Sequence, residues 1–416
     1  MMRAPDVKHD AALQPANRAL AAAALVLAFL FTTTGRGLTE SFTVYLLPIS
    51  ASFGWDRAEI VSIYSLALLA TGLSGPLVGR LFDRAGPRAV YGCGLVLAGS
   101  GFLAASYAQK LWHLQLSIGL GVGLGCACLG IVTGSVLISR WFGPRLPSAA
   151  AVVHSATGVG VLLLVPLSQT LIDHFGWRDS YRMTGIALLC LVIPILTIPW
   201  RRLAAGSPAL HTPRTRDSGD DGWTLRRAIR ESTFWGLFAS FFFTGLGMTA
   251  ISPQVVAYLV DAGFAPLQAA TAWGFSGVLL VIGLIGVSWL DRLIGRMPTM
   301  FLMYALSSVG LLLLWLLHHY PTSWLLACFL ITFGSSLGSR GPLITATAMH
   351  IFRGKHVGSI FGTIAIATGL GPALGSWTGG WIHDVTQSYD GVIAFAFVSI
   401  WFGMIPFIAV RVLRTL

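Results

Sequence analysis

The chain has 416 residues, of which 55% are hydrophobic and only 10% are charged, and its mean hydropathy is +0.75. About a quarter of the residues of a soluble domain are usually charged, so this composition excludes a water-soluble fold and favours a membrane protein. The net charge of +11 would suggest nucleic-acid binding in a soluble protein, but the placement of the basic residues, described below, argues against it.

Twelve apolar runs follow one another along the chain, each long enough to cross the hydrocarbon core of a bilayer. Their ranges are 20–47, 57–82, 89–107, 112–140, 148–173, 180–200, 234–260, 267–290, 298–317, 323–350, 356–383 and 391–412. Gly, Asp and Arg crowd the interval between the sixth and seventh runs, which predicts a loop with one short surface helix. We therefore expect an all-α membrane protein with an N-terminal tail (1–19), a six-helix bundle (20–200), a central loop (201–233), a second six-helix bundle (234–412) and a C-terminal tail (413–416).

The basic residues predict the orientation of the chain. Of the 27 Lys and Arg residues, 21 fall in the two tails and the even-numbered loops, and only four fall in the odd-numbered loops. Because cytoplasmic loops carry the excess of Lys and Arg, both termini are predicted to be cytoplasmic. The basic charge is thus a topology signal, and we expect a multi-pass protein of the plasma membrane, the inner membrane of a bacterium, that binds no nucleic acid.

One loop pattern occurs twice, once in each half. The second and third apolar runs are joined by GRLFDRAGPR, which contains Asp83, Arg84 and Arg88, and the eighth and ninth by DRLIGR, which contains Asp291 and Arg292. The two Asp residues are 208 positions apart, half the chain. This spacing predicts a duplicated six-helix unit, which is how many transporters are built.

These loops resemble the cytoplasmic loop signature of the major facilitator superfamily, whose members have twelve helices in two bundles. The resemblance implies secondary transport and a gating role for the five charged residues named above. Charges at this face can cap helix ends and pair with neighbouring helices, and those pairs must break when that side opens.

A finer resemblance rests on the run FGWDR after the first helix and the run FGWR, followed by Tyr181, after the fifth. This pattern is similar to the monocarboxylate and oxalate/formate transporter branch, which implies a small organic anion moved with a proton or by exchange. One feature departs from that branch: helices 8 and 11, where it commonly places a substrate cation, have no Lys or Arg in their interiors. Helix 5 also lacks the GP-x-x-GG element that drug exporters typically carry, which argues against an exporter.

Arg36 and Glu40 lie four residues apart near the middle of helix 1, so both project from one helix face. A charge at the bilayer centre costs about 2.5–3.5 kcal/mol, so such a residue faces a cavity or a partner. Two interpretations stay open: an anion-binding Arg beside a protonatable Glu, or a structural ion pair that locks helix packing.

Arg340 lies near the middle of helix 10, among Gly338, Gly341 and Pro342, which predict a kinked or locally opened helix. Opened helices near the midplane often form transporter binding sites, and the planar guanidinium suits a carboxylate. The alternative is that Arg340 bonds freed carbonyl groups or the Glu40 carboxylate. A carboxylate held between Arg36 and Arg340 would bridge the two bundles, as alternating access requires.

Four further residues are weaker candidates. His154 in helix 5 could relay protons near neutral pH, although a lone His is more often a packing residue. Tyr64, Gln254 and Trp273 could hydrogen-bond a substrate or simply line a cavity.

No cofactor, metal or ATP site is predicted. The five cysteines lie in apolar segments without metal-ligand spacing, and the alternating glycines of helix 4 indicate close helix packing. No nucleophile, base and orienting group converge, so we expect no enzyme. We predict a monomeric transporter in the lipid bilayer that carries a small organic anion, a monocarboxylate or related carboxylate, by proton symport with a proton as coupling ion or by anion exchange. The alternatives are an exporter of drugs or other lipophilic solutes, and a membrane sensor without transport.

Overall fold

The computed structural model describes residues 15–143, 146–206, 223–352 and 357–414, and within these residues the regular structure is entirely helical. Nine helical runs among them are long and apolar enough to cross a membrane. Two of the nine, Arg57–Ala105 and Ser148–Thr197, have 49 and 50 residues. Each is too long for a single crossing of the hydrocarbon core, and each contains a non-helical residue, Gly86 in the first and Gly176 in the second, that divides it into two helices.

The residues before 207 are called the N-terminal half and those after 222 the C-terminal half. The helices of the N-terminal half are α1 (Pro15–Glu40), α2 (Phe42–Phe53), α3 (Arg57–Ala105), α4 (Leu111–Leu114), the π-helix η1 (Gln115–Val122), α5 (Gly123–Leu129), α6 (Ile131–Ser139), α7 (Leu146–Cys190), α8 (Val192–Thr197) and α9 (Trp200–Ala205). Those of the C-terminal half are α10 (Leu225–Ala228), α11 (Ser232–Ile251), the short 3-10 helix η4 (Ser252–Gln254), α12 (Val255–Asp261), α13 (Pro266–Ile294), α14 (Arg296–His319), α15 (Ser323–Phe329), the π-helix η5 (Leu330–Gly334), α16 (Arg340–Ile351), α17 (Val357–Ala365), α18 (Ala367–Thr386), α19 (Asp390–Ala409) and α20 (Arg411–Arg414).

Most boundaries lie within a few residues of those expected from the sequence. The first helix begins at Pro15, before the predicted residue 20, and the predicted central loop contains the short helices α9 and α10. Residues 207–222 of that loop lie outside the described residues, as do residues 1–14 of the N-terminal tail and 415–416 of the C-terminal tail.

Glycines bend the two long helices. Gly86 in α3 has φ 76° and ψ 175°, and Gly176 in α7 has φ 77° and ψ 163°, a backbone region that is essentially restricted to glycine. Gly295, between α13 and α14, has nearly the same conformation as Gly86, with φ 82° and ψ 170°. The two loops that resemble each other in sequence therefore turn in the same way, which supports the internal repeat.

Several of the predicted spanning helices are interrupted. Among them, the first divides at Ser41 into α1 and α2, the fourth divides at Gly130 into α5 and α6, and the tenth is open at residues 337–339, before α16. The opening beside Arg340 was predicted from its glycines and proline, and the structure confirms it. The break at Gly130 was not predicted, although the preceding glycines pack as expected: a Cβ on Gly123 or Gly125 would meet α3 at under 3 Å.

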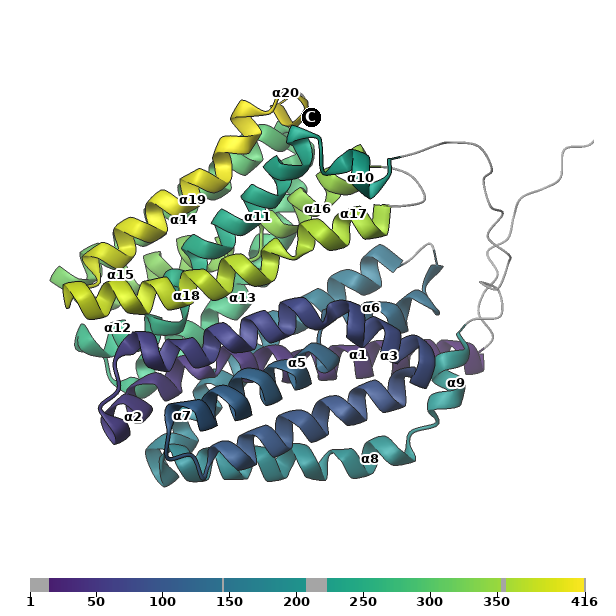
Figure 1. Ribbon diagram of the computed structural model, residues 1–416, viewed down its shortest axis with the longest axis horizontal. Coiled ribbons are helices and arrows are strands. Elements are labelled where there is room, and N and C mark those ends of the chain that lie inside the picture. The colour runs from purple at the N-terminus through teal and green to yellow at the C-terminus, as the bar shows by residue number, and fades with distance from the viewer. Residues whose placement is uncertain (1–14, 144–145, 207–222, 353–356, 415–416) are drawn as a thin grey trace, which may run out of the picture.

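The two halves form separate groups of helices that lie against one another (Figure 1). The turns after α2, α12 and α18 gather at one end of the molecule, called here the far end, whereas α9, α10 and α20 lie at the opposite end, called the tail end. Close backbone contacts join the halves near the middle. A Cβ on Gly72 would lie 2.6 Å from Gly369, and one on Gly158 would lie 2.0 Å from the carbonyl oxygen of Gly277.

The halves contact each other unevenly along their length. Among the described residues, the hydrogen bonds that join the halves all start from the first three turns of α3, at the far end. Toward the tail end, a Cβ built on Gly75, Gly79, Gly286 or Gly362 would meet nothing within 4 Å. The halves therefore meet closely at the middle and far end, and these four glycines toward the tail end have no neighbour to pack against in the part of the chain that the structure describes.

Candidate functional site

Arg36 and Glu40 form an ion pair on α1. The guanidinium Nη2 lies 3.1 Å from the Glu40 Oε1, and the two side chains are 34% and 14% exposed. On the other side of the carboxylate, the Tyr64 hydroxyl from α3 approaches Oε2 at 3.5 Å. The structure thus brings together three residues predicted from the sequence, and it leaves the Arg36 Nε buried without a partner. The pair is therefore not enclosed in a packed core.

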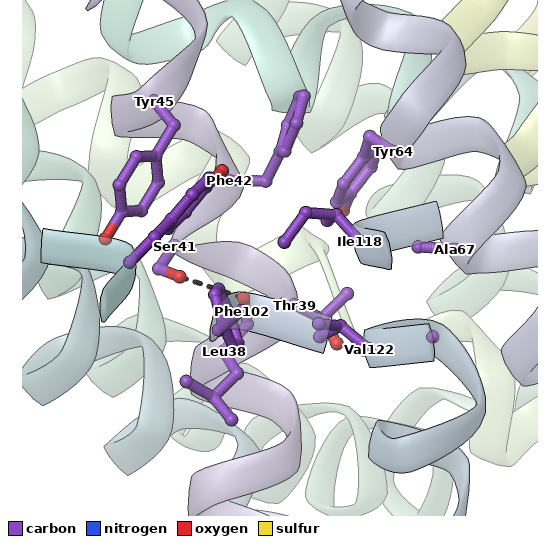
Figure 2. Close-up of a pocket in the computed structure, with 12 residues that line it drawn as sticks. Leu38, Thr39, Ser41, Phe42, Tyr45, Tyr64, Ala67, Phe102, Ile118 and Val122 are labelled. Carbon is purple, nitrogen blue, oxygen red and sulfur yellow. Dashed lines mark hydrogen bonds between the residues drawn. The ribbon is translucent and has the colours of Figure 1, made fainter. Parts of the chain in front are cut away.

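A small cavity lies beside this cluster within the N-terminal half. Figure 2 shows Tyr64 on one side of it, Tyr45 on the other and Phe42 between them. Its volume is about 20 Å³, which is room for one water molecule. Thr39, Ser41 and the two tyrosines line it together with apolar side chains. This cavity is too small for a carboxylic acid, so it is not a substrate site, although a water in it would lie close to Tyr64.

Arg340, the first residue of α16, is only 2% exposed. Its Nη2 donates to the Ser307 hydroxyl and, at 3.1 Å, to the Ser336 carbonyl, and its guanidinium carbon lies 4.8 Å from the centre of the Tyr304 ring. The Nη1 is buried without a hydrogen-bond partner. Among the described residues no carboxylate pairs with this buried cation, and the carbonyl that it binds is one freed by the opened helix.

Each arginine is held by its own half. The partner of Arg36 is Glu40 on α1, and Tyr64 on α3 donates to that carboxylate. The partners of Arg340 belong to the segment before α16, to α14 and, through the Met248 sulfur at 3.5 Å, to α11. No contact between the two arginines, and none between Arg340 and Glu40, is present among the described residues. Of the two alternatives to anion binding by Arg340, bonding to a freed carbonyl is therefore observed, and pairing with Glu40 is not.

Gln254 and Trp273 are both buried, at 0% and 2% exposure. The Gln254 amide donates to the Ala250 carbonyl at 3.2 Å, while its Oε1 and the Trp273 indole N–H have no partner. His154 is exposed on α7, one helical turn before Gly158, the residue that touches Gly277 of the other half. Residues four apart share a helix face, so His154 faces the C-terminal half where the two halves diverge.

A network of charges ties the halves together at the far end. The Asp384 carboxylate accepts hydrogen bonds from the backbone N–H groups of Arg57 at 2.9 Å and Ala58 at 2.6 Å, and so caps the start of α3. The Arg57 guanidinium reaches Asp261 at 3.0 Å, and the Tyr389 hydroxyl donates to the same carboxylate at 3.2 Å. Burial raises the pKa of Tyr389 above its ordinary value, so its hydroxyl stays protonated at neutral pH. These residues, Arg57, Asp261, Asp384 and Tyr389, are called the clasp.

The clasp was not recognised in the sequence. A usable signal was present, because acidic residues stood at the ends of helices 7 and 11 in loops that contain few charges. An isolated charge at such a position can pair with a charge from another loop. Nothing in the sequence indicated which loops meet.

Residues 25–376 match the sequence family described as the Major Facilitator Superfamily. The chain belongs to this superfamily. It is therefore a multi-pass integral membrane protein and a transporter, not an enzyme.

Members of the superfamily with similar sequences cover nearly the whole chain. An uncharacterized MFS-type transporter, YcxA, of Bacillus subtilis (strain 168) is 25% identical over 402 residues, 92% of this chain and 94% of its own. Monocarboxylate transporter 12 of Rattus norvegicus is 26% identical over 424 residues, 93% and 85% of the two chains. The crystal structure of the peptide transporter POT in complex with sulfate has a TM-score of 0.70 at 12% identity, covering 96% of this chain and 99% of that one, which supports the fold alone.

The repeated loops of this superfamily member differ in their contacts. Asp83, Arg84 and Arg88 are exposed, and no hydrogen bond or ion pair joins them to another described residue. In the second loop Arg292 is exposed, whereas Asp291 lies 3.7 Å from Arg296.

The two FGW runs, which carry the finer family resemblance, pack together at the far end. The rings of Phe53 and Trp55 stack at 4.0 Å, and the Trp177 indole N–H donates to the Ser52 hydroxyl at 2.8 Å. Arg178 lies 4.3 Å over the Trp177 ring and donates to the Ala108 carbonyl at 2.8 Å. The runs therefore join three loops of the N-terminal half beside the clasp.

Proposed function

We propose that this transporter carries a small organic anion, a monocarboxylate or related carboxylate, by proton symport or anion exchange. The observation that supports the proposal is the triad of Arg36, Glu40 and Tyr64 on two membrane helices. Arg36 supplies a cation for the carboxylate, and Glu40 supplies a group that can be neutralised by a proton. The names of the related monocarboxylate transporters agree with this substrate class.

The coupling follows from competition for one guanidinium. In the present arrangement Glu40 occupies Arg36 at 3.1 Å. A carboxylate substrate that binds Arg36 displaces a negative group, and protonation of Glu40 removes the repulsion between the two carboxylates. Substrate and proton then bind together more favourably than either alone, which is the requirement for symport.

Alternating access would use the uneven contact between the halves. We propose that the chain crosses the plasma membrane twelve times, in two six-helix bundles at 20–200 and 234–412. Both termini and the tail end would then lie in the cytoplasm. The excess of Lys and Arg in the tails and even-numbered loops supports this orientation. With the clasp joined and the four glycines toward the tail end lacking a described neighbour, the state described here is then the one open to the cytoplasm.

Uptake by purified protein in liposomes tests the proposal. Labelled acetate, lactate, pyruvate and benzoate are offered at several pH values to the wild type and to Arg36→Ala and Arg340→Ala, with Arg201→Ala, an exposed arginine of α9, as the matched control. We expect uptake of at least one acid by the wild type and the control, and a loss of roughly 100-fold in both site variants. Wild-type rates in both site variants would show that the site assignment is wrong. Drug resistance on overexpression, without uptake of any acid, would instead favour an exporter.

A further inference from the structure

Helix 4 restarts inside the membrane. Gly130, with φ −80° and ψ −173°, is extended and separates α5 from α6, and its own N–H donates to the Ala127 carbonyl at 3.3 Å. The first backbone hydrogen bond of α6 runs from the Gly134 N–H to the Gly130 carbonyl at 3.2 Å. The N–H groups of residues 131–133 precede that bond and have no carbonyl one turn back. The start of a helix also carries a partial positive charge, so this point favours an anion.

Two buried hydroxyl groups lie at the same point. Thr133, in the first turn of α6, is 1% exposed, and Thr32 of α1 is fully buried, yet neither hydroxyl has a hydrogen-bond partner. The Thr32 Oγ1 lies 3.3 Å from the position that a Cβ on Gly134 would take, so it faces the first turn of α6. Threonines in membrane helices usually donate to the carbonyl four residues back, as Thr34 does to Leu30 at 2.9 Å. Two donors without acceptors in a dry interior indicate a missing acceptor.

Arg36 lies at the level of this break. A Cβ on its neighbour Gly35 would be 3.0 Å from the Leu129 Cβ, at the end of α5. Thr32 and Arg36 are four residues apart and so lie on the same side of α1, one turn from each other. Amide and hydroxyl donors thus meet at this point, and a guanidinium whose Nε lacks a partner lies one turn further along α1. This donor set matches a carboxylate and would repel a metal cation.

The internal repeat contains a second opened helix. The α16 helix begins at Arg340, 209 residues after α6 begins at Ile131, and the loop glycines Gly86 and Gly295 are also 209 apart. A π-helix lies upstream of each restart, η1 in helix 4 and η5 in helix 10. In the second copy the cation, Arg340, is itself the first residue of the restarted helix. The repeat has therefore kept an interrupted helix and an arginine beside it in both halves.

We propose that the first turn of α6 is a carboxylate cradle, in which the anion accepts hydrogen bonds from the amides of residues 131–133 and from the hydroxyls of Thr32 and Thr133, with Arg36 as its counter-charge. The start of α16 with Arg340 is the matching cradle of the other half, which meets the same anion as the halves close. This inference rests on the proposed function, which names the substrate class, and adds where the carboxylate lies and which groups bind it.

The test uses the full chain in liposomes and the acid found to be transported among acetate, lactate, pyruvate and benzoate. Thr32→Val and Thr133→Val keep the shape of the side chain and remove the donor, while Thr32→Ser and Thr133→Ser keep the donor. Thr34→Val, which removes a hydroxyl on another face of α1, is the matched control. We expect each valine variant to raise KM about tenfold or more with little change in kcat, because a hydrogen bond to a charged group is lost. The serine variants and the control should keep the wild-type KM.

The possible outcomes separate the two proposals. A wild-type KM in both valine variants, together with lost uptake in Arg36→Ala, would overturn the cradle and leave the proposed function intact. A fall in kcat at unchanged KM, without rescue by serine, would assign the threonines to packing and overturn the cradle as well. If the wild type transports none of the acids and none raises its melting temperature, the proposed function fails and the cradle fails with it.

Discussion

The two halves share an internal repeat, but their central arginines differ in exposure and in hydrogen-bond partners. In the N-terminal half Arg36 is partly exposed and paired with Glu40 at 3.1 Å. In the C-terminal half Arg340 is 2% exposed and is held by hydroxyl and carbonyl oxygens and an aromatic ring, with no carboxylate among the described residues. One half therefore holds a cation whose charge is already compensated, and the other holds a cation whose charge is not.

This difference indicates a division of labour. A buried charge without a counter-ion is expensive, and it is retained only where an anion compensates it for part of the cycle. A partly exposed charge pair can act as a switch, because a proton or a second anion can separate it. We infer that the C-terminal half supplies the stronger attraction for an anion and that the N-terminal half couples its binding to a proton. The predictions below test this contrast, beginning with the largest expected effect.

The first prediction concerns Arg340→Met. Replacing a buried charge by an apolar side chain of similar length is often neutral or stabilising, so we expect the melting temperature of the purified protein to stay the same or to rise. Uptake should nevertheless fall at least about 100-fold, because the uncompensated cation is gone. Thermal unfolding and liposome uptake are measured on the same preparation. A large fall in melting temperature would instead show that Arg340 stabilises the fold through its hydrogen bond to the Ser336 carbonyl.

The second prediction concerns Glu40→Gln. The amide keeps a hydrogen bond to Arg36 and has no proton to exchange, so an inward proton gradient should no longer accelerate uptake. The lost acceleration should be roughly tenfold, within the usual range of coupling between two bound ligands. Exchange of internal for external acid at equal pH should continue, because it needs no proton. Undiminished acceleration by the gradient would move the coupling group away from Glu40, with His154 as the next candidate.

The sequence predicted the helical spans, the repeat and the superfamily, because hydropathy, charge placement and turn glycines are local signals. The opened helix beside Arg340 was predicted because Gly338, Gly341 and Pro342 are residues that interrupt helices. The break at Gly130 was not predicted, because the glycines that precede it pack closely against other helices. Arg36 and Glu40 were found because a charge in an apolar run stands out. The clasp was missed because its meaning depends on which distant loops meet, and no local pattern contains that information.

The third prediction uses the contacts near the middle of the interface between the halves. A Cβ on Gly158 would lie 2.0 Å from the Gly277 carbonyl oxygen, whereas a Cβ on Gly75 would meet nothing within 4 Å. Gly158→Ala should destabilise the present state by about 1–3 kcal/mol through overpacking. Gly75→Ala, the matched control, should be neutral or slightly stabilising, because alanine favours a helix. Melting temperatures of the two variants, compared in detergent, measure the difference. Equal melting temperatures for the two variants would mean that the halves do not pack against each other at Gly158 and Gly277. This contact could then not couple the two halves.

The last prediction concerns the clasp, where the two halves again differ: the N-terminal half supplies Arg57 and backbone N–H groups, and the C-terminal half supplies the carboxylates of Asp261 and Asp384. Removing a helix cap costs about 1 kcal/mol, so Asp384→Ala should shift the balance toward the state open at the far end by roughly fivefold. The shift is measured as faster labelling of Ser65→Cys by a membrane-impermeant maleimide, in a chain whose own five cysteines are replaced.

Ser65 is a suitable reporter because its hydroxyl lies 2.6 Å from that of Ser376, so it is covered while the halves are joined. Asp179→Ala is the control, since Asp179 pairs with Arg182 inside one half and should leave the labelling rate unchanged. If Asp384→Ala also leaves it unchanged, the clasp does not hold the far end closed, and the tight packing of Gly72 against Gly369 and of Gly158 against Gly277 must hold it instead.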